Sequence, residues 1–246
     1  TADQTFYSAD YIISTIHPKR MLEMLDTKLI RPAFRTRINS IPQTAGGFAV
    51  YVKFRAGTMP YMNTNYYGYN CGTPWNCEHY TDSEWPKGFL YMHMCHEDGA
   101  KWAESGVILS YMNFEEVAQW SGTRIGRRGE SYEAFKRDRA ERLMANVEKH
   151  CPGFIQSVES YFTSTPLTYY DYTGTEGGSM YGVAKDINMG AAGRVPYRIK
   201  VPNLLLAGQN VNSHGMLGVI VGTVVTCSEL VPAEEIYKQI NKIEKQ

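Results

Sequence analysis

The sequence predicts an α+β protein in which an antiparallel β-sheet domain with flanking helices is inserted between two ends that form one α/β layer. Three observations favour this fold class. Short apolar runs typical of buried strands lie near both ends, at 9–16 and 203–207, and a helical pattern follows each of them. The region between them contains segments that alternate with the period of half-buried strands. The 246 residues suffice for one large domain or two small ones.

The first predicted elements are two strands and a short helix. The run ADYIISTI at 9–16 is apolar and β-branched, which predicts a strand buried on both faces. Pro18 suits the first turn of a helix that continues through Leu25. Residues 46–55 alternate in polarity, which predicts a half-buried strand. One face of this strand would carry Phe48, Val50, Val52 and Phe54. The other face would carry Tyr51, Lys53 and Arg55.

The middle of the chain combines a long irregular stretch with two further strands. Residues 57–86 are rich in Gly, Pro, Asn and Tyr, which predicts a long loop or a set of very short strands. Phe89–Cys95 and Val107–Tyr111 are predicted strands, with a turn at Asp98 and Gly99 between them. A turn of this kind favours antiparallel pairing, so we expect an antiparallel sheet.

The second half of the chain begins with a helix and ends with a strand, a loop and a helix. Apolar residues at helical spacing predict an amphipathic helix at Ser131–His150. An aromatic, Thr-rich segment and a glycine-punctuated loop follow. The run NLLLA at 203–207 predicts a buried strand, 208–215 a polar loop, and Met216 onward a helix that is bent or broken at Pro232.

Composition excludes several classes of protein. The 25 basic and 25 acidic residues give a net charge of +0, and only 20% of residues are charged, which argues against a nucleic-acid partner. The cysteines are odd in number and contain no C-x-x-C, which favours a reducing compartment. The sequence shows no secretory signal, so we expect a cytoplasmic location. The 18 Tyr and 11 Met supply a large, adaptable apolar surface.

Two kinds of chemistry have weak support in the sequence. A cluster of possible zinc ligands comprises Cys71, Cys77, His79, His93, Cys95 and His96. Its spacing matches no standard zinc finger, so ordinary buried thiols and paired imidazoles are the favoured interpretation, and we predict no metal site. A weaker alternative is a zinc protein that uses Cys71, Cys77, His93 and Cys95. No G-x-S-x-G, H-E-x-x-H or P-loop is present, and nothing favours a Ser or Cys triad, although sequence alone does not exclude one.

The C-terminal strand, loop and helix form a candidate ligand site. The helix that begins near Met216 has a glycine-bearing first turn, whose backbone N–H groups and positive dipole end could receive an anionic or electron-rich ligand edge. Gly215 and Gly218 would let a flat ring approach the backbone closely. The alternative interpretation is an ordinary α/β layer whose glycines only permit tight packing. Spacing alone leaves both open.

Three segments resemble one family. The run NLLLAGQNVNSHGMLGVIVG is similar to the C-terminal flavin-binding segment of the phytoene desaturase, carotenoid isomerase and retinol saturase group, within the amine-oxidase-like FAD oxidoreductases. A second segment, ADYIISTIHPKRMLEML, resembles the strand and helix with which that family's chain re-enters the FAD domain. A third segment, TPLTYYDYTGTEGGSMYG, resembles the part of the family that comes before its final strand. The resemblance implies an FAD-domain piece at 1–30, a substrate domain at 31–185 and a C-terminal piece of a Rossmann-like FAD domain at 186–246.

The resemblance also implies a reaction and a set of site residues. The enzyme would desaturate, saturate or isomerise a carotenoid, retinoid or similar apolar polyene, with hydride passing between a substrate carbon and the flavin. The residues implied to bind FAD are Gly208, Gln209, Asn210, Leu217, Gly218, Val219 and Ile220, and those implied to line an apolar substrate channel are Tyr170, Tyr172 and Tyr181. Gln209 departs from the family, which more often has an acid there. No catalytic residue is assigned.

One family feature is missing from these residues. Family members open with a strand, a G-x-G-x-x-G turn and a helix that bind the ADP half of FAD, and no G-x-G occurs here. Since the first residue is Thr1, we expect a C-terminal portion of a longer flavoenzyme, which alone binds FAD weakly or not at all and is inactive. The alternative is a stand-alone, non-catalytic module that binds an apolar or glycan ligand on an aromatic-rich sheet.

Partners follow from the same resemblance. The implied partner is an apolar small molecule, and because polyenes reside in lipid, a peripheral membrane contact is allowed. No strongly basic amphipathic segment requires that contact. On the helix from Ser131, the residues Arg137, Arg139 and Arg142 alternate with acids, which predicts a solvated face. The oligomeric state is not predicted.

Overall fold

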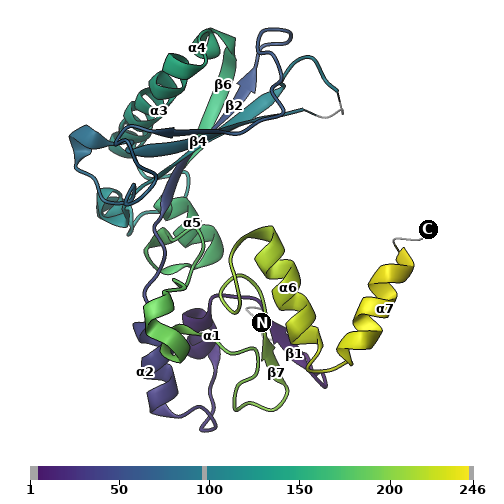
Figure 1. The fold of residues 1–246 in the computed structure, drawn as a ribbon. Helices are drawn as coiled ribbons and strands as arrows, with labels where there is room; N and C mark the ends of the chain where they lie inside the picture. Colours follow the sequence, from purple (N-terminus) through teal and green to yellow (C-terminus); the bar gives the residue numbers. More distant parts are fainter. Residues whose placement is uncertain (1–4, 96–98, 244–246) are drawn as a thin grey trace. The chain divides into compact units, whose positions relative to one another are not determined.

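The computed structural model describes residues 5–95 and 99–243. The chain divides into two compact units: unit 1 comprises Thr1–Thr44 and Tyr181–Gln246, and unit 2 comprises Ala45–Met180 (Figure 1). Thr1, His96 and Asp98, which the sequence analysis named, lie outside the described residues.

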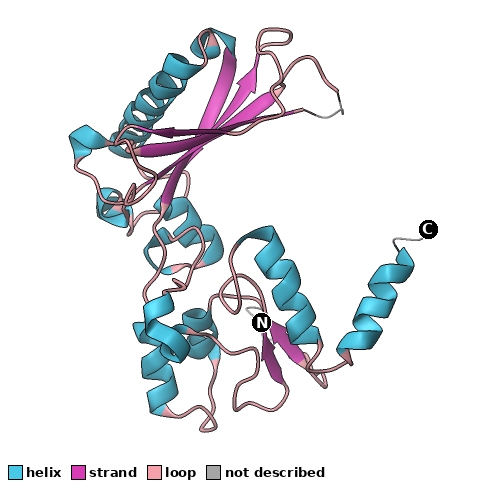
Figure 2. Cartoon of the chain, in the orientation of Figure 1, coloured by secondary structure: helices cyan, strands magenta, loops and turns pink. Residues whose placement is uncertain are grey.

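Unit 2 is built on a five-stranded antiparallel sheet with the strand order β3-β4-β5-β2-β6 (Figure 2). The strands are β2 (Gly47–Phe54), β3 (Tyr66–Tyr69), β4 (Gly88–Met94), β5 (Ser105–Tyr111) and β6 (Val158–Ser164). The predicted antiparallel pairing of the segments around 89–95 and 107–111 is confirmed, because β4 pairs antiparallel with β5. The stretch 57–86 contains only β3 and a short 3-10 turn, Asp82–Glu84, as the sequence predicts.

One face of this sheet packs on the long helix α3 (Glu130–His150) and the short helix α4 (Phe154–Ser157) (Figure 1). The predicted alternation of β2 is confirmed: the side chains directed to this core are Phe48, Val50, Val52 and Phe54, and all are buried. The apolar stripe of α3 is buried against them, as its helical spacing predicts.

Arg139 on α3 is buried, so the prediction that it lies on a solvated face is wrong. The residue is only 5% exposed, because its guanidinium donates to Glu116 Oε2 at 2.9 Å and lies 5.1 Å above the centre of the Trp85 ring. An ion pair and an aromatic face replace the water that the charge gives up.

The remaining elements of unit 2 are short. Two 3-10 turns span Phe114–Glu116 and Ala118–Trp120, and a third spans Glu176–Gly178. Helix α5 (Pro166–Thr173) begins at a Thr165 capping box, with Pro166 in the first turn. It ends at Gly174, whose φ of +66° is the left-handed conformation that favours glycine.

Unit 1 contains a two-stranded parallel sheet of β1 (Ile12–Ser14) and β7 (Leu204–Leu206). All of β7 is buried, whereas Ile12 is 54% and Ile13 47% exposed. The prediction that this first strand is buried on both faces is therefore wrong. Among the described residues β1 pairs only with β7, so it is an edge strand with uncovered side chains.

Helices make up much of the rest of unit 1. They are α1 (Pro18–Met24), α2 (Pro32–Ser40), α6 (Gly215–Cys227) and α7 (Ala233–Ile243), with a 3-10 segment at Ile187–Gly193. The predicted helix after Pro18 and the break at Pro232 are confirmed. The buried Thr226 hydroxyl donates to Leu206 O at 3.0 Å and fastens α6 to β7. None of the described helices has both the length and the apolar character to cross a membrane.

Candidate functional site

The loop after β7 lies at the carboxyl ends of two parallel strands. β1 and β7 run in the same direction, so Thr15 and Gly208, which follow them, lie at the same edge of the sheet. Gly208 has a φ of +94°, and a Cβ built on it would lie 3.6 Å from Thr15 O. The left-handed turn favours glycine here, whereas a Cβ would make only an ordinary van der Waals contact with Thr15. Ligands of parallel α/β sheets bind at this edge, so the loop occupies the expected place for a ligand.

Asn210, in this loop, has a structural role. Its side chain is buried, and its Oδ1 accepts a hydrogen bond from Val183 N at 2.9 Å. A Cβ on Gly182, which has a φ of +74°, would lie 2.0 Å from that oxygen. The amide therefore holds the 182–183 backbone against the loop, and only glycine fits beside it.

His214, directly before α6, is a site residue that the sequence analysis did not select. Its Nε2 lies 2.8 Å from Val183 O, and because a carbonyl only accepts, this nitrogen carries the proton. Burial lowers the pKa of His214 below its usual range, which keeps the ring neutral. The Tyr181 ring stacks on the imidazole with centroids 5.6 Å apart. Tyr181, an expected substrate residue, thus lies beside the loop expected to bind the cofactor.

The first turn of α6 is open. His214 at the N-cap makes no side-chain hydrogen bond to the helix, and Leu217 and Ile220 are exposed. The first N–H groups of any helix lack partners inside it, so they can donate to a ligand. A Cβ on Gly218 would lie 2.6 Å from the backbone carbon of Ser213. Gly218 is therefore required by the packing of the loop on the helix, whether or not a ring approaches.

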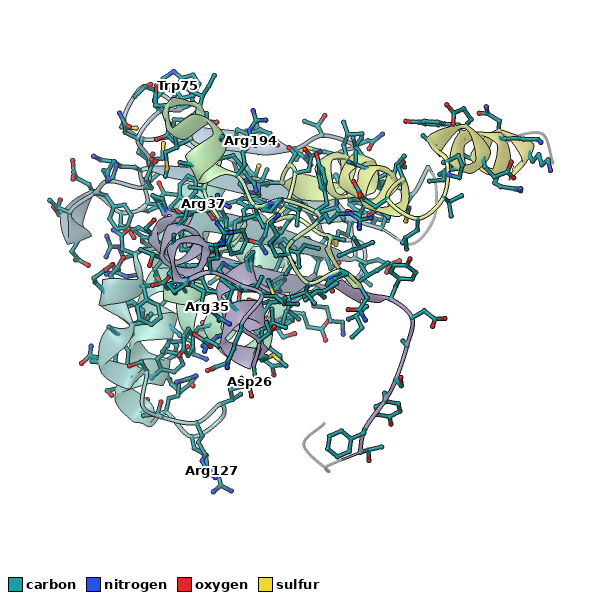
Figure 3. All side chains as sticks on the ribbon, turned by 90° about the horizontal axis from the view of Figure 1, so that it is seen from below. Asp26, Arg35, Arg37, Trp75, Arg127 and Arg194 are labelled. Atoms are coloured by element: carbon teal, nitrogen blue, oxygen red, sulfur yellow. The ribbon has the colours of Figure 1, made fainter. Side chains whose placement is uncertain are left out.

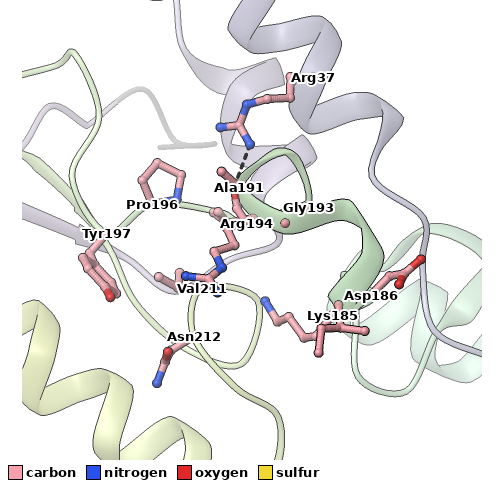
Figure 4. Close-up of a pocket in the computed structure, with 13 residues that line it drawn as sticks. Arg37, Lys185, Asp186, Ala191, Gly193, Arg194, Pro196, Tyr197, Val211 and Asn212 are labelled. Carbon is pink, nitrogen blue, oxygen red and sulfur yellow. Dashed lines mark hydrogen bonds between the residues drawn. The ribbon is translucent and has the colours of Figure 1, made fainter.

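A cationic pocket of about 640 Å³ borders the loop (Figure 4). Arg37, Lys185 and Arg194 supply its positive charges, and Asp186 is the one acid among its described lining residues. Arg37 Nη1 donates to Ala192 O at 3.0 Å and to Arg194 O at 2.7 Å, and the Lys185 ammonium donates to Asn210 O. Burial lowers the pKa of Lys185 to about 8. This excess of positive charge suits an anionic group.

In unit 2, the sheet face opposite α3 has an apolar, partly exposed area, which is bordered on β2 by the ion pair of Lys53 with Glu159. Cross-strand register places Met92, Val107, Tyr51 and Phe162 in one row across four strands. The Tyr51 and Phe162 rings stack with centroids 4.7 Å apart and an interplanar angle of 14°, and Phe162 is 68% exposed. Leu90 and Leu109 form the next row, and the exposed Tyr67 extends it. A contiguous apolar surface of this kind is typical of a binding site.

The tyrosines that the sequence implies for the substrate site are different from those on this face. Tyr170 and Tyr172 lie on α5 in unit 2, where Tyr170 contacts Phe114 with ring centroids 6.0 Å apart and Tyr172 is exposed. Phe162 was missed because β6 shows no alternation in sequence. The alternation around Tyr51 had already placed that residue on the face away from the core.

The members of the Cys and His cluster that the structure describes do not converge on one point. Cys71 and Cys77 have Sγ atoms 4.0 Å apart. His93 is engaged elsewhere: its Nε2 bonds to the Tyr91 hydroxyl, and its Nδ1 accepts from Met62 N at 3.3 Å. Across residues 5–95 and 99–243, no three His, Cys, Asp or Glu side chains are grouped so as to hold a metal ion.

Comparison with known proteins shows weak homology to reductases. The chain is 27% identical over 155 residues to the all-trans-retinol 13,14-reductase of Macaca fascicularis, an alignment that covers 60% of this chain and 24% of that protein. It is 27% identical over 141 residues to the Homo sapiens protein of the same name, covering 56% of this chain and 23% of that protein. It is 28% identical over 133 residues to the Rattus norvegicus protein of the same name, covering 53% of this chain and 22% of that protein.

The chain thus spans about a quarter of the length of the curated relatives it matches. No family model matches it. The homology confirms the coarser part of the resemblance drawn from the sequence, namely a relationship to oxidoreductases of the retinol saturase kind.

Proposed function

We propose that this chain is the C-terminal substrate-binding and partial flavin-binding region of an FAD-dependent oxidoreductase that acts on a carotenoid, retinoid or similar apolar polyene. One observation carries the proposal: a glycine loop and an open helix start at the carboxyl edge of parallel strands, in a chain related to reductases of all-trans-retinol. The whole-protein activity is inferred, because the match covers about a quarter of those relatives.

The chemistry of the residues at this edge supports FAD as the ligand. Gly208 and Gln209 would lie at the ribityl and phosphate part, and the N–H groups from Leu217 to Ile220 would face the pyrimidine end of the flavin, where they stabilise negative charge. Asn210 would act indirectly, by holding the loop in place. Arg37, Lys185 and Arg194 add positive charge nearby. The bound flavin would supply the hydride chemistry, and no side chain is assigned a catalytic role.

The apolar face of the sheet in unit 2 supports an apolar substrate. Stacked Tyr51 and Phe162 and the neighbouring Met92 and Val107 offer an apolar surface, with Lys53 at its border. A conjugated chain would gain contact with these rings and side chains and leave water. We include Tyr170, Tyr172 and Tyr181 as further substrate contacts. A cytoplasmic location with peripheral membrane contact remains part of the proposal, since such a substrate partitions into lipid.

Upstream residues would complete the flavin domain. Ile12 and Ile13 are exposed, and one edge of β1 pairs with no strand of the described residues, so further strands of a dinucleotide-binding unit could add there. We therefore expect the 246 residues alone to bind FAD weakly or not at all. A second candidate function, a non-catalytic module for an apolar or glycan ligand, is favoured by the same aromatic sheet face taken alone.

The test uses the longer protein that contains this chain. We expect the purified protein to show a flavin absorption spectrum and to convert a retinoid or carotenoid, measured by chromatography. Gly218→Val should lower the flavin content, because its side chain collides with Ser213, whereas Gly122→Val should not, because a Cβ there meets no atom within 4 Å. Phe162→Asp should raise KM and leave flavin content unchanged. A flavin-free protein that still binds the polyene would favour the module instead.

A further inference from the structure

Two free cysteines lie together in the turn that follows β3. The Cys71 and Cys77 sulfur atoms are 4.0 Å apart. Both thiols point toward the same acceptor, Thr73 O, at 3.2 Å from Cys71 Sγ and 3.7 Å from Cys77 Sγ. A disulfide has an S–S length of about 2 Å, so the two sulfur atoms need to approach by roughly 2 Å to bond. The proposed flavin and polyene sites use neither residue.

The two thiols differ in accessibility. Cys71 is exposed and lines a pocket of about 410 Å³, which Glu84, Lys87 and Lys149 also line, so a small thiol reagent can reach its sulfur. Cys77 is buried, and its sulfur lies 2.9 Å from where a Cβ on Gly88 would be. Burial raises the pKa of Cys77 above its usual range. An incoming reagent therefore meets Cys71 first, and Cys77 is placed to react second.

The turn between them has room to move. Gly72 has a φ of +69°, and a Cβ built on it would meet no atom within 4 Å. Trp75, which lies between the two cysteines in the sequence, is 75% exposed and projects outward (Figure 3). Since the turn is open to solvent on this side, the Cys71 side chain can approach Cys77 without displacing the core of unit 2.

We propose that Cys71 and Cys77 are a thiol-modification site, which low-molecular-weight disulfides oxidise to an intramolecular disulfide through the accessible Cys71. In the first step the Cys71 thiolate attacks a disulfide RSSR, the S–S bond breaks, and one RS⁻ leaves as a mixed disulfide forms. In the second step Cys77 loses its proton and attacks the Cys71 sulfur, which expels the second RS⁻. Two protein thiols are oxidised, and one RSSR is reduced to two RSH.

A Cys71–Cys77 disulfide would change the turn that follows β3, the strand at the edge of the apolar sheet face. Asn70, next to Cys71, donates to Pro86 O at 2.6 Å and so ties the end of β3 to the start of β4. A Cys71–Cys77 bond would shorten the turn that continues from this tie. Because β3 carries the exposed Tyr67, the oxidation state of the pair would affect the border of that face.

The experiment exposes the purified chain to oxidised glutathione, stops thiol exchange with acid, and blocks free thiols with excess alkylating reagent in denaturant near neutral pH. Peptides are then mapped by mass spectrometry. No Lys or Arg lies between Arg55 and Lys87, so both cysteines fall in one tryptic peptide, 56–87, which contains no other cysteine. The expected product is this peptide lacking two hydrogen atoms and carrying no alkyl group. A reductant should restore two alkylated thiols.

Variants separate the two steps. Cys77→Ser should trap Cys71 as a mixed disulfide with glutathione, and Cys71→Ser should slow the modification of Cys77 at least tenfold. Cys151→Ser and Cys227→Ser should leave formation of the bond unchanged. The proposal is overturned if the wild-type peptide keeps two free thiols, if a stable glutathione adduct accumulates on it, or if Cys77 reacts as fast without Cys71 as with it.

Discussion

Replacement of Asn210 by Ala tests whether this residue acts by holding the loop rather than by touching the cofactor. The substitution removes the oxygen that accepts from Val183 N at 2.9 Å. Val183 is fully buried, so its N–H would be left without a partner and without water. A buried donor left unsatisfied costs about 1–3 kcal/mol. We therefore expect the 182–183 segment to lose about 2 kcal/mol of local stability.

The assay is amide hydrogen exchange of the isolated chain, followed by mass spectrometry or NMR. A loss of about 2 kcal/mol corresponds to roughly a 30-fold faster exchange of the Val183 amide, since 1.4 kcal/mol is a factor of ten. Thr44 N, which donates to Gly182 O at 2.8 Å, reports whether the neighbouring bridge opens too. The four Trp residues all lie in unit 2, so their fluorescence monitors whether unit 2 stays folded.

Two variants serve as controls. Asn212→Ala changes an exposed asparagine of the same loop and should leave Val183 protected. Asn210→Asp keeps an acceptor at the same place and should restore much of the protection. If Val183 exchanges at the wild-type rate in Asn210→Ala, the amide does not hold this backbone, and a direct role of Asn210 toward the cofactor becomes the better explanation.

Two further predictions concern charged groups. Burial lowers the pKa of Lys185 from 10.5 to about 8. Between pH 8 and 10.5 the Lys185 side chain is therefore mostly neutral in the folded state and mostly protonated in the unfolded state. The free energy of unfolding of the wild type, minus that of Lys185→Gln, should therefore be constant below pH 8 and rise between pH 8 and 10.5. Urea titrations measure this difference, and a difference that stays constant from pH 8 to 10.5 would contradict the prediction. Arg139→Ala should lower the stability of unit 2 by about 3 kcal/mol in titrations followed by Trp fluorescence, because it leaves Glu116 without its buried partner. Arg137→Ala, which breaks the exposed pair with Glu130, should have no measurable effect, and equal effects of the two variants would refute the argument.

The elements that the sequence predicted well are those with one fully buried side. β2 alternates because one face meets the helices and the other does not, and α3 shows its 3.6-residue period for the same reason. Helix α2 was missed because Ile38 is its one buried residue, so its apolar pattern is too weak to detect. Strand β6 was missed because it lies at the sheet edge, where its side chains are mostly exposed on both faces.

The sequence predicts the glycines of the candidate site, but it does not predict which residues contact one another there. Gly208 and Gly218 are forced by a turn and by close packing, which local sequence can indicate. The bond from Val183 to Asn210 joins residues 27 positions apart, and the stack of Tyr181 on His214 spans a similar separation. Such pairs depend on how the chain returns to the sheet, which no local pattern encodes. The row from Met92 to Phe162 likewise requires the strand register.

Strand β1 offers a test of whether unit 1 is completed by further chain, as the proposed function requires. Ile13 is 47% exposed, and nothing in the described part of the chain pairs with the free edge of β1. In the isolated 246 residues, Ile13→Lys should therefore change the melting temperature little, because exposed substitutions typically cost within 0.5 kcal/mol. In the longer protein, an added strand and its helices would bury this position, and a lysine there would be a charge without a partner.

We accordingly expect Ile13→Lys to destabilise the longer protein by more than about 2 kcal/mol and to reduce its flavin content. Met24→Lys, at an exposed position on α1, is the matched control and should be neutral in both proteins. If Ile13→Lys is equally tolerated in the longer protein, the upstream residues do not cover β1. The completion of the flavin domain at this edge would then have to be abandoned, whereas the loop and helix at the carboxyl edge would stand.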